Sequence, residues 1–204
     1  MIVSPENFLP DKFGIDNLTM EKALTGLLSR KVDYADLYLE YVTSESLNLE
    51  EGLVKNASRN ITQGVGVRAI AGDKTGYAYS DDVSLQHIQL AARTAGYIAA
   101  ESGDNSIVSL NKMKKPGLNL YPLDIYPTDV PVEAKVRLLD KIDRMARTYD
   151  SRIRNVLASF TSQYKVILIV TSEGLIIGDI QPLCRLNVTC IAEDGENRQV
   201  GSFG

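Results

Sequence analysis

The sequence predicts an α+β protein: an N-terminal domain of helices around a β-hairpin sheet, a proline-rich connector, and a helix leading into an antiparallel β region. Three observations predict this class. Three segments carry apolar residues at helical spacing, and several others alternate between apolar and polar residues. Four of the seven prolines also lie together between Lys112 and Pro131.

The proline cluster divides the chain into three predicted parts. Residues 1–110 form the N-terminal α+β domain, residues 111–130 the connector, and residues 131–204 a helix plus an antiparallel β region. The last residues, Val200–Gly204, fall inside the returning strand of a hairpin. We therefore expect an unpaired sheet edge there and interpret the second domain as truncated.

The helical spacing defines three helices. They cover Thr19 to Arg30, Ser84 to Ser102 with Gly103 following as the C′ residue, and Pro131 to about Tyr149. The predicted buried faces are Met20, Ala23, Leu24, Leu27 and Leu28 in the first helix, Leu85, Ile88, Ala92, Ala95 and Ala99 in the second, and Val132, Val136, Leu139, Ile142, Met145, Ala146 and Tyr149 in the third.

A glycine-rich stretch raises the question of a nucleotide site. Gly64 to Ala69 fits the G-x-G-x-x-A fingerprint of dinucleotide-binding loops, which needs a helix directly after the glycines. Here Gly72-Asp73 interrupts any such helix, and the apolar and polar residues alternate on both sides of it. We predict a β-hairpin with a Gly-Asp turn, in which Gly64 and Gly66 allow a bulge or a close backbone approach.

The remaining strands follow from the same alternation. Ala35 to Glu50 is one long strand or two strands joined by a bend, and Leu53 to Ser58 is a short strand. The apolar run Val166–Val170 predicts a strand covered on both faces. Turns at residues 172–174 and 193–197 separate the strands that follow it.

The chemistry-bearing residues are few. Cys184 and Cys190 lie on one face of a strand, roughly 20 Å apart, too far for a disulfide or a metal pair, so we interpret both as small core residues. The single histidine, His87, lies off its helix's apolar stripe and is interpreted as a surface residue. One histidine cannot supply a histidine-rich zinc site, and no nucleotide or serine-hydrolase motif occurs. We therefore assign no catalytic and no metal-binding residue.

Composition limits the partners. The 204 residues carry a net charge of −4 with 44% hydrophobic residues, and basic residues do not cluster, which argues against nucleic acid or a membrane surface as a partner. The N-terminus has acidic residues and prolines where a signal peptide has an apolar core. We expect a soluble cytoplasmic protein.

Three blocks, Asp33–Tyr38, Gln63–Ala69 and Lys74–Tyr79, resemble the N-terminal domain of the TldD/PmbA (TldE) metallopeptidase family, and the similarity continues to Glu193-Asp194-Gly195. The resemblance implies a bacterial cytoplasmic protease that pairs with a TldE/PmbA-like subunit and degrades peptides and small proteins. Family members are also linked to maturation of a microcin precursor, and a name used for the family links it to DNA gyrase modulation.

The sequence departs from the family at the metal centre. The family holds zinc in its C-terminal half on an H-E-x-x-x-H helix with a later cysteine, and this sequence contains neither. We expect an N-terminal fragment, inactive alone, that needs a TldE-like subunit or a chain with the C-terminal half. The alternative is a non-enzymatic module that binds a TldE-like partner or peptide strands. Arg68, with Gly64 and Gly66, is the candidate partner- or substrate-binding residue, although we favour the interpretation of Arg68 as a solvated or paired strand arginine.

Overall fold

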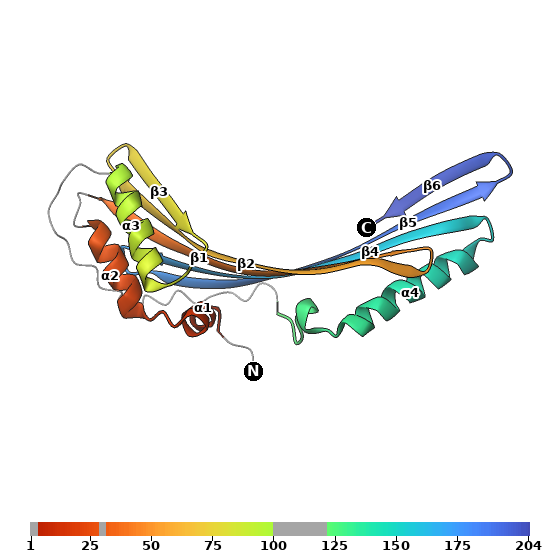
Figure 1. Cartoon of the computed structure of the whole chain (residues 1–204), viewed down its shortest axis with the longest axis horizontal. Helices are drawn as coiled ribbons and strands as arrows, with labels where there is room; N and C mark the ends of the chain where they lie inside the picture. The colour runs from red at the N-terminus through yellow and green to blue at the C-terminus, as the bar shows by residue number, and fades with distance from the viewer. Residues whose placement is uncertain (1–3, 29–31, 100–121) are drawn as a thin grey trace. The chain divides into compact units, whose positions relative to one another are not determined.

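The computed structural model describes residues 4–28, 32–99 and 122–204 and confirms the α+β class (Figure 1). These residues form four α-helices, one 3₁₀ helix and one six-stranded antiparallel sheet with strand order β3-β2-β1-β4-β5-β6. The elements are α1 (Pro5–Phe13), α2 (Asn17–Leu28), β1 (Tyr34–Glu50), β2 (Leu53–Ala71), β3 (Lys74–Ser80), α3 (Leu85–Ala99), η1 (Pro127–Asp129), α4 (Val132–Tyr149), β4 (Ile153–Thr171), β5 (Ile176–Asp194) and β6 (Asn197–Phe203).

The chain divides into two compact units. Unit 1 comprises residues 1–42, 62–121 and 165–180, and unit 2 comprises residues 43–61, 122–164 and 181–204. The long strands therefore contribute to both units; β1, for example, gives residues 34–42 to unit 1 and residues 43–50 to unit 2. The predicted sequence boundaries at 110 and 130 stay a prediction, since residues 100–121 lie outside the described residues.

In unit 1, helices α2 and α3 contact each other, and α3 packs on β3. Helix α2 begins at Asn17, two residues before the predicted start, because the Asp16 carboxylate accepts a hydrogen bond from the Thr19 backbone N–H at 2.8 Å and caps the helix. All five residues predicted for its buried face are buried. Arg30 lies outside the described residues.

The prediction for the second helix is confirmed over Leu85–Ala99 in α3, whereas Ser102 and Gly103 lie outside the described residues. Ile88, Ala92, Ala95 and Ala99 are buried as predicted. Leu85 is 40% exposed, so its predicted burial is wrong. It is the first residue of the helix, three positions before Ile88, the first buried residue of α3.

The hairpin prediction is confirmed. Strand β2 pairs antiparallel with β3 from Val65↔Ser80 to Ala71↔Lys74, so Gly72-Asp73 is the two-residue turn. The segment predicted as a separate short strand from Leu53 to Ser58 is instead the start of the 19-residue strand β2. The sequence prediction ended this strand at Ser58, but β2 lies beside β1 in the sheet and its backbone stays extended through this position.

In unit 2, α4 packs on β1 and β4 through a small core of Leu47, Leu49, Leu139, Ala158 and Phe160. The predicted inward face of this helix is partly wrong. Leu139 is fully buried, but Val132, Met145 and Tyr149 are 49%, 60% and 89% exposed. The apolar arc of α4 is wider than the surface it covers, and the charged residues Lys135 and Asp143 occupy buried positions instead.

The β region of the second half agrees with the prediction in its order and turns. Val166, Leu168 and Val170 are fully buried in β4, and the turn before β6 closes at Asp194↔Asn197. The prediction of two core cysteines is wrong, because Cys184 is exposed and Cys190 half-buried. Most of β5 is only partly covered: Leu186 packs against the core under α4, and Cys190 lines a pocket beside Ile142 and Met145 of that helix.

Within the described residues, none of the α-helices is both long and apolar enough to span a bilayer.

Candidate functional site

The candidate site is the face of the β2–β3 hairpin that points away from α3. Gly76 faces α3, because a Cβ on it would collide with the backbone of Ala95 and Ala99. Strand alternation then places Arg68 and its register partner Tyr77 on the opposite face. Gly66 and its partner Tyr79 share that face. We call these four residues the Arg68 face.

The two candidate glycines make close packing possible on the hairpin. A Cβ at Gly66 would lie 2.5 Å from the Tyr77 hydroxyl oxygen and 3.2 Å from two of its ring carbons, so the Tyr77 side chain lies across the glycine. A Cβ at Gly64 would lie 2.9 Å from the Ser80 carbonyl oxygen. The predicted close backbone approach is found at Gly64, whereas the close neighbour of Gly66 is the Tyr77 side chain. A strand follows Gly66 where a nucleotide loop needs a helix.

Arg68 is an ion-paired residue. Its Nε and Nη2 atoms lie 2.9 Å and 2.5 Å from Oδ2 of Asp36, a carboxylate that is buried. The hydrogen bond to Asp36 raises the pKa of the Arg68 guanidinium. The guanidinium also lies 5.9 Å from the centroid of the Tyr34 ring. The side chain is still 48% exposed, so it is held in position and accessible at once.

A second polar cluster on β1 and β4 of unit 1 is also internally satisfied. Oε2 of Glu40 accepts hydrogen bonds from the Tyr38 hydroxyl at 2.7 Å and from Nζ of Lys165 at 2.6 Å. Burial raises the pKa of Glu40, but the hydrogen bonds from Lys165 and Tyr38 outweigh it, so the net shift is downward. A carboxylate that is held ionised between two donors is a poor proton carrier at neutral pH.

The exposed groups of the Arg68 face are therefore aromatic rings and one oriented cation. Tyr77 and Tyr79 are 58% and 78% exposed. Such groups supply contact area and hydrogen bonding to a partner surface.

The residues present do not fit the zinc site that the family resemblance implies. His87 is at the start of α3, where its Nδ1 lies 2.9 Å from the Ser84 hydroxyl oxygen and 3.1 Å from a carboxylate oxygen of Asp82. It is a surface residue, as predicted, with 41% of its side chain exposed. Among residues 4–28, 32–99 and 122–204, no three His, Cys, Asp or Glu side chains gather in a way that could hold a metal ion.

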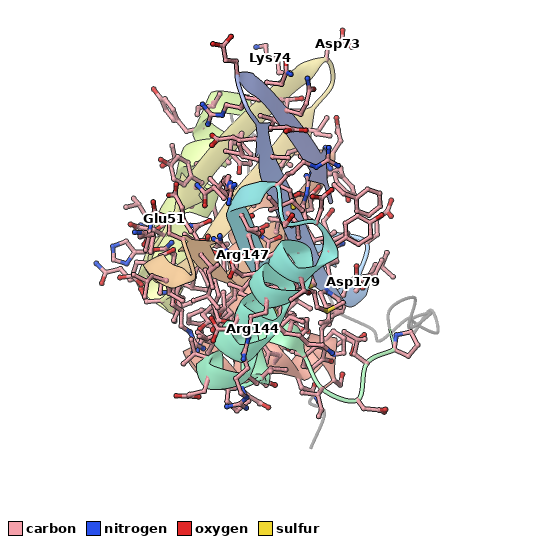
Figure 2. All side chains as sticks on the ribbon, turned by 90° about the vertical axis from the view of Figure 1, so that its right-hand side faces the viewer. Glu51, Asp73, Lys74, Arg144, Arg147 and Asp179 are labelled. Carbon is pink, nitrogen blue, oxygen red and sulfur yellow. The ribbon has the colours of Figure 1, made fainter. Side chains whose placement is uncertain are left out.

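Two ion-pair clusters of unit 2 were not predicted from the sequence. Lys135, buried in α4, bonds the Glu45 carboxylate of β1, which also lies 3.5 Å from Arg59. These residues are up to 90 positions apart, so no local pattern signals the contact. Figure 2 shows Arg147 on α4 and Glu51 at the tip of the β1–β2 hairpin.

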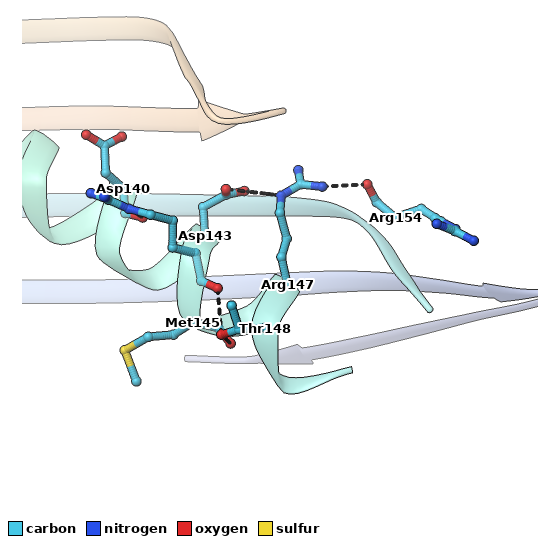
Figure 3. Close-up of polar contacts among 7 residues, drawn as sticks. Asp140, Asp143, Met145, Arg147, Thr148 and Arg154 are labelled. Carbon is cyan, nitrogen blue, oxygen red and sulfur yellow. Dashed lines mark hydrogen bonds and ion pairs between the residues drawn. The ribbon is translucent and has the colours of Figure 1, made fainter. Parts of the chain in front are cut away.

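The other cluster joins α4 to the start of β4 (Figure 3). Nε of Arg147 lies 3.1 Å from both carboxylate oxygens of Asp143, and Nη1 donates to the Arg154 carbonyl at 2.8 Å. The i,i+4 spacing of Asp143 and Arg147 is a sequence signal that would have predicted their contact.

Two family models match this chain. The model described as PmbA/TldA metallopeptidase domain 1 matches residues 35–99, and the PmbA/TldA metallopeptidase central domain matches residues 125–204. A metalloprotease TldD homolog of Haemophilus influenzae is 38% identical over 181 residues, which are 86% of this chain and 36% of that protein. One of Buchnera aphidicola is 33% identical over 89% of this chain and 37% of that protein. The chain thus spans little more than a third of the length of these relatives.

Solved structures share the fold at low identity. A putative modulator of DNA gyrase from Bacteroides thetaiotaomicron superimposes with a TM-score of 0.66 at 16% identity, over 91% of this chain and 43% of that one. TldE from Thermococcus kodakarensis gives a TM-score of 0.65 at 16% identity, over 90% of this chain and 42% of that one. At this identity the likeness establishes the architecture alone.

Proposed function

This chain belongs to the PmbA/TldD metallopeptidase family, and from that premise we propose that it is the N-terminal, non-catalytic portion of a TldD-like metalloprotease. One observation carries the proposal: the family's first and central domains match residues 35–99 and 125–204 in that order. The relatives from Haemophilus influenzae and Buchnera aphidicola are named as metalloprotease TldD homologs, and this chain spans 36–37% of their length.

In this proposal the zinc ligands and the general base belong to the family's C-terminal half, with its H-E-x-x-x-H helix. His87, Cys184 and Cys190 take no part in metal binding. The environment of His87 supports this, because Ser84 and Asp82 already engage its ring at the start of α3. This chain binds and positions the partner or the substrate, and the hydrolysis of peptides and small proteins takes place elsewhere in the assembled enzyme.

We propose a TldE-like subunit as the partner and the Arg68 face, with Gly64 and Gly66, as part of the surface that meets the partner or the substrate. The exposed rings of Tyr77 and Tyr79 and the oriented Arg68 guanidinium support this role. The fold shared with a TldE structure over 90% of this chain is compatible with paired subunits of similar architecture. A cytoplasmic location comes from the same family resemblance.

A reconstitution experiment tests the proposal. The chain is assayed for peptide release from unfolded casein with added zinc, first alone, then with a TldE-like subunit, then also with a polypeptide carrying the H-E-x-x-x-H half. We expect release only in the last mixture, and its loss on chelation or on replacing the motif glutamate by glutamine. Zinc-dependent release by the chain alone, together with one tightly held zinc per chain, would overturn the proposal.

The second candidate function is a non-enzymatic interaction module, favoured by the absence of a nucleophile–base pair on the Arg68 face among its described residues. Binding of a TldE-like partner without any gain in hydrolysis, in every mixture, would support it. Arg68→Ala is a poor probe alone, because it removes the ion-pair partner of the buried Asp36 carboxylate and so lowers the melting temperature. Tyr79→Ser is the matched probe: it should weaken partner binding and leave the melting temperature unchanged, since the ring is 78% exposed.

A further inference from the structure

The first half of β2 is an open sheet edge. β2 lies between β1 and β3 in the sheet, but its pairing with β3 begins only at Val65. Among the described residues, Leu53–Ile61 therefore has a strand on one side only. All nine residues of this segment are exposed, and all belong to unit 2. At about 3.3 Å per residue the edge is roughly 30 Å long.

This edge lacks most of the features that protect exposed strands. Natural edge strands are kept short or interrupted by proline or by a bulge, and Leu53–Ile61 contains neither proline nor glycine. In an antiparallel strand every second residue directs its N–H and C=O groups outward. Nine residues thus present a row of unsatisfied backbone donors and acceptors, which only another extended chain can pair in register.

The charge of the edge selects among possible strands. Leu53–Ile61 carries Lys55 and Arg59 and no acidic residue, in a chain whose net charge is −4. Lys55 and Arg59 are four residues apart, so alternation places them on one face with Ala57 between them.

Both cations remain available to a partner. Nζ of Lys55 lies 3.1 Å from Glu51, and Nη1 of Arg59 lies 3.5 Å from Glu45, but the two basic side chains are 45% and 61% exposed. The Lys55–Glu51 pair is exposed on both sides and contributes little. Glu45 is only 15% exposed and also bonds Lys135, so Arg59 shares this carboxylate and its own guanidinium stays open to a partner. Lys55 and Arg59 therefore repel a second basic edge and attract an acidic one.

We propose that the Leu53–Ile61 edge of β2 binds an extended acidic polypeptide strand, which adds to the sheet with carboxylates four residues apart facing Lys55 and Arg59. The carboxylates lie about 13 Å apart in such a strand. A second copy of this chain is the poorer occupant, because it brings its own Lys55 and Arg59 to the junction. The inference rests on the proposed binding of peptides or a partner, and it names the site and the chemistry of that strand.

The test uses a labelled peptide of nine residues, the length of Leu53–Ile61, with glutamate at its third and seventh positions, matching Lys55 and Arg59. The pattern is symmetric, so it fits either strand direction. Its other positions are threonine and valine. Binding to the 204-residue chain is followed by fluorescence anisotropy without metal. We expect saturable binding that weakens with salt.

Matched changes in the peptide and in the protein separate the contribution of charge from that of backbone pairing. Replacing both glutamates by lysine, or combining Lys55→Glu with Arg59→Glu in the protein, should weaken binding at least about tenfold. Lysine in the peptide should bind again to that double variant. N-methylation of alternate peptide amides, in both possible phases, should abolish binding in at least one phase, because it removes the outward-facing donors. Lys74→Glu, a charge reversal at the tip of the β2–β3 hairpin, should leave binding unchanged.

The outcomes are decisive for this edge. The proposal would be overturned if both N-methylated peptides bound as tightly as the unmodified peptide, or if the Lys55→Glu, Arg59→Glu variant bound that peptide as tightly as the wild type. Self-association of the chain through this edge in place of peptide binding would also overturn it. The assay involves no hydrolysis. If the peptide binds in this assay but the reconstitution gives no hydrolysis, only the proposed function is wrong. If the reconstitution gives hydrolysis but the peptide does not bind, only this inference is wrong.

Discussion

The helices of unit 1 and unit 2 cover the sheet in different ways. In α2 and α3 every buried residue is apolar or glycine, and α3 lies so close to β3 that Gly76 has no room for a side chain. In α4 the buried residues are Lys135, Leu139 and Asp143, so two of the three carry charge. The helices α2 and α3 of the first unit thus bury only apolar residues and glycine, whereas α4 of the second unit adds a single fully buried leucine to its core, with ion-paired Lys135 and Asp143 beside it.

The difference shows that an apolar stripe at helical spacing does not by itself decide burial. α4 has a wide apolar arc, yet Met145 and Tyr149 are exposed and Lys135 is buried. A long lysine reaches its partner Glu45 while its methylene groups pack on the sheet. We expect the stability of unit 2 to depend on fewer residues than the stability of unit 1.

The largest effect is expected in the core of unit 2. Leu139→Ala should lower the free energy of unfolding by about 2–5 kcal/mol, because it leaves a cavity in a core of five residues. The matched control is its neighbour Leu138, which is 40% exposed and whose replacement by alanine should cost under about 1 kcal/mol. Urea denaturation followed by circular dichroism measures both, and equal losses would contradict the asymmetry.

The next effect tests close packing in unit 1. Gly76→Ala should lower the free energy of unfolding by about 1–3 kcal/mol, because the new methyl group collides with backbone atoms of α3 that have no freedom to move away. Gly26→Ala in α2 is the control: nothing lies within 4 Å of its added Cβ, and helix propensity predicts a gain of roughly 0.5–1 kcal/mol. A gain at both positions would show that α3 does not pack closely on β3.

A smaller effect of opposite sign is expected at the tip of the β1–β2 hairpin. Glu51 and Gly52 both have positive φ, at 53° and 71°, the geometry in which asparagine followed by glycine is preferred. Glu51→Asn should raise the free energy of unfolding by about 1 kcal/mol. The control is Asp73→Asn at the other labelled hairpin tip (Figure 2), where the glycine carries the positive φ, and we expect no gain there. Thermal denaturation distinguishes the two, and equal gains would point to charge instead of backbone strain.

The smallest effect is a titration in unit 2. Burial, together with Tyr126 and Asp129, raises the pKa of Tyr164 to about 12. The contribution of this phenol to stability is complete below the unfolded pKa of about 10 and is lost as the pH rises through about 12. Phenolate absorbance should show a late component that Tyr164→Phe removes and that Tyr126→Phe moves to lower pH. A single transition in the wild type, unchanged by Tyr164→Phe, would contradict this environment.

The sequence was sufficient to predict the elements whose structure is determined by a local pattern of residues. The turn at Gly72-Asp73 and the buried faces of α2 and α3 follow from glycine chemistry and from spacing within one segment. The exposure of Cys184 and Tyr149 could not be predicted, because it depends on how far a neighbouring element reaches. Arg68, Gly64 and Gly66 were singled out from the sequence as candidates, but Tyr77 and Tyr79 were not, and the contact of Arg68 with Asp36 joins positions 32 apart and has no local signal.

The position of β1 beside β4 has a consequence for synthesis on the ribosome. In unit 1 the Ala35 backbone N–H donates to the hydroxyl of Ser172, 137 residues later. At typical bacterial and eukaryotic elongation rates, roughly 7 to 30 s pass between the emergence of these two residues. During that interval β1 has β2 on one side and an open edge on the other, so the nascent chain presents an unpaired apolar strand before the fold can close. Over that time the open edge of β1 can pair with the wrong strand, and a chaperone that covers it would prevent this.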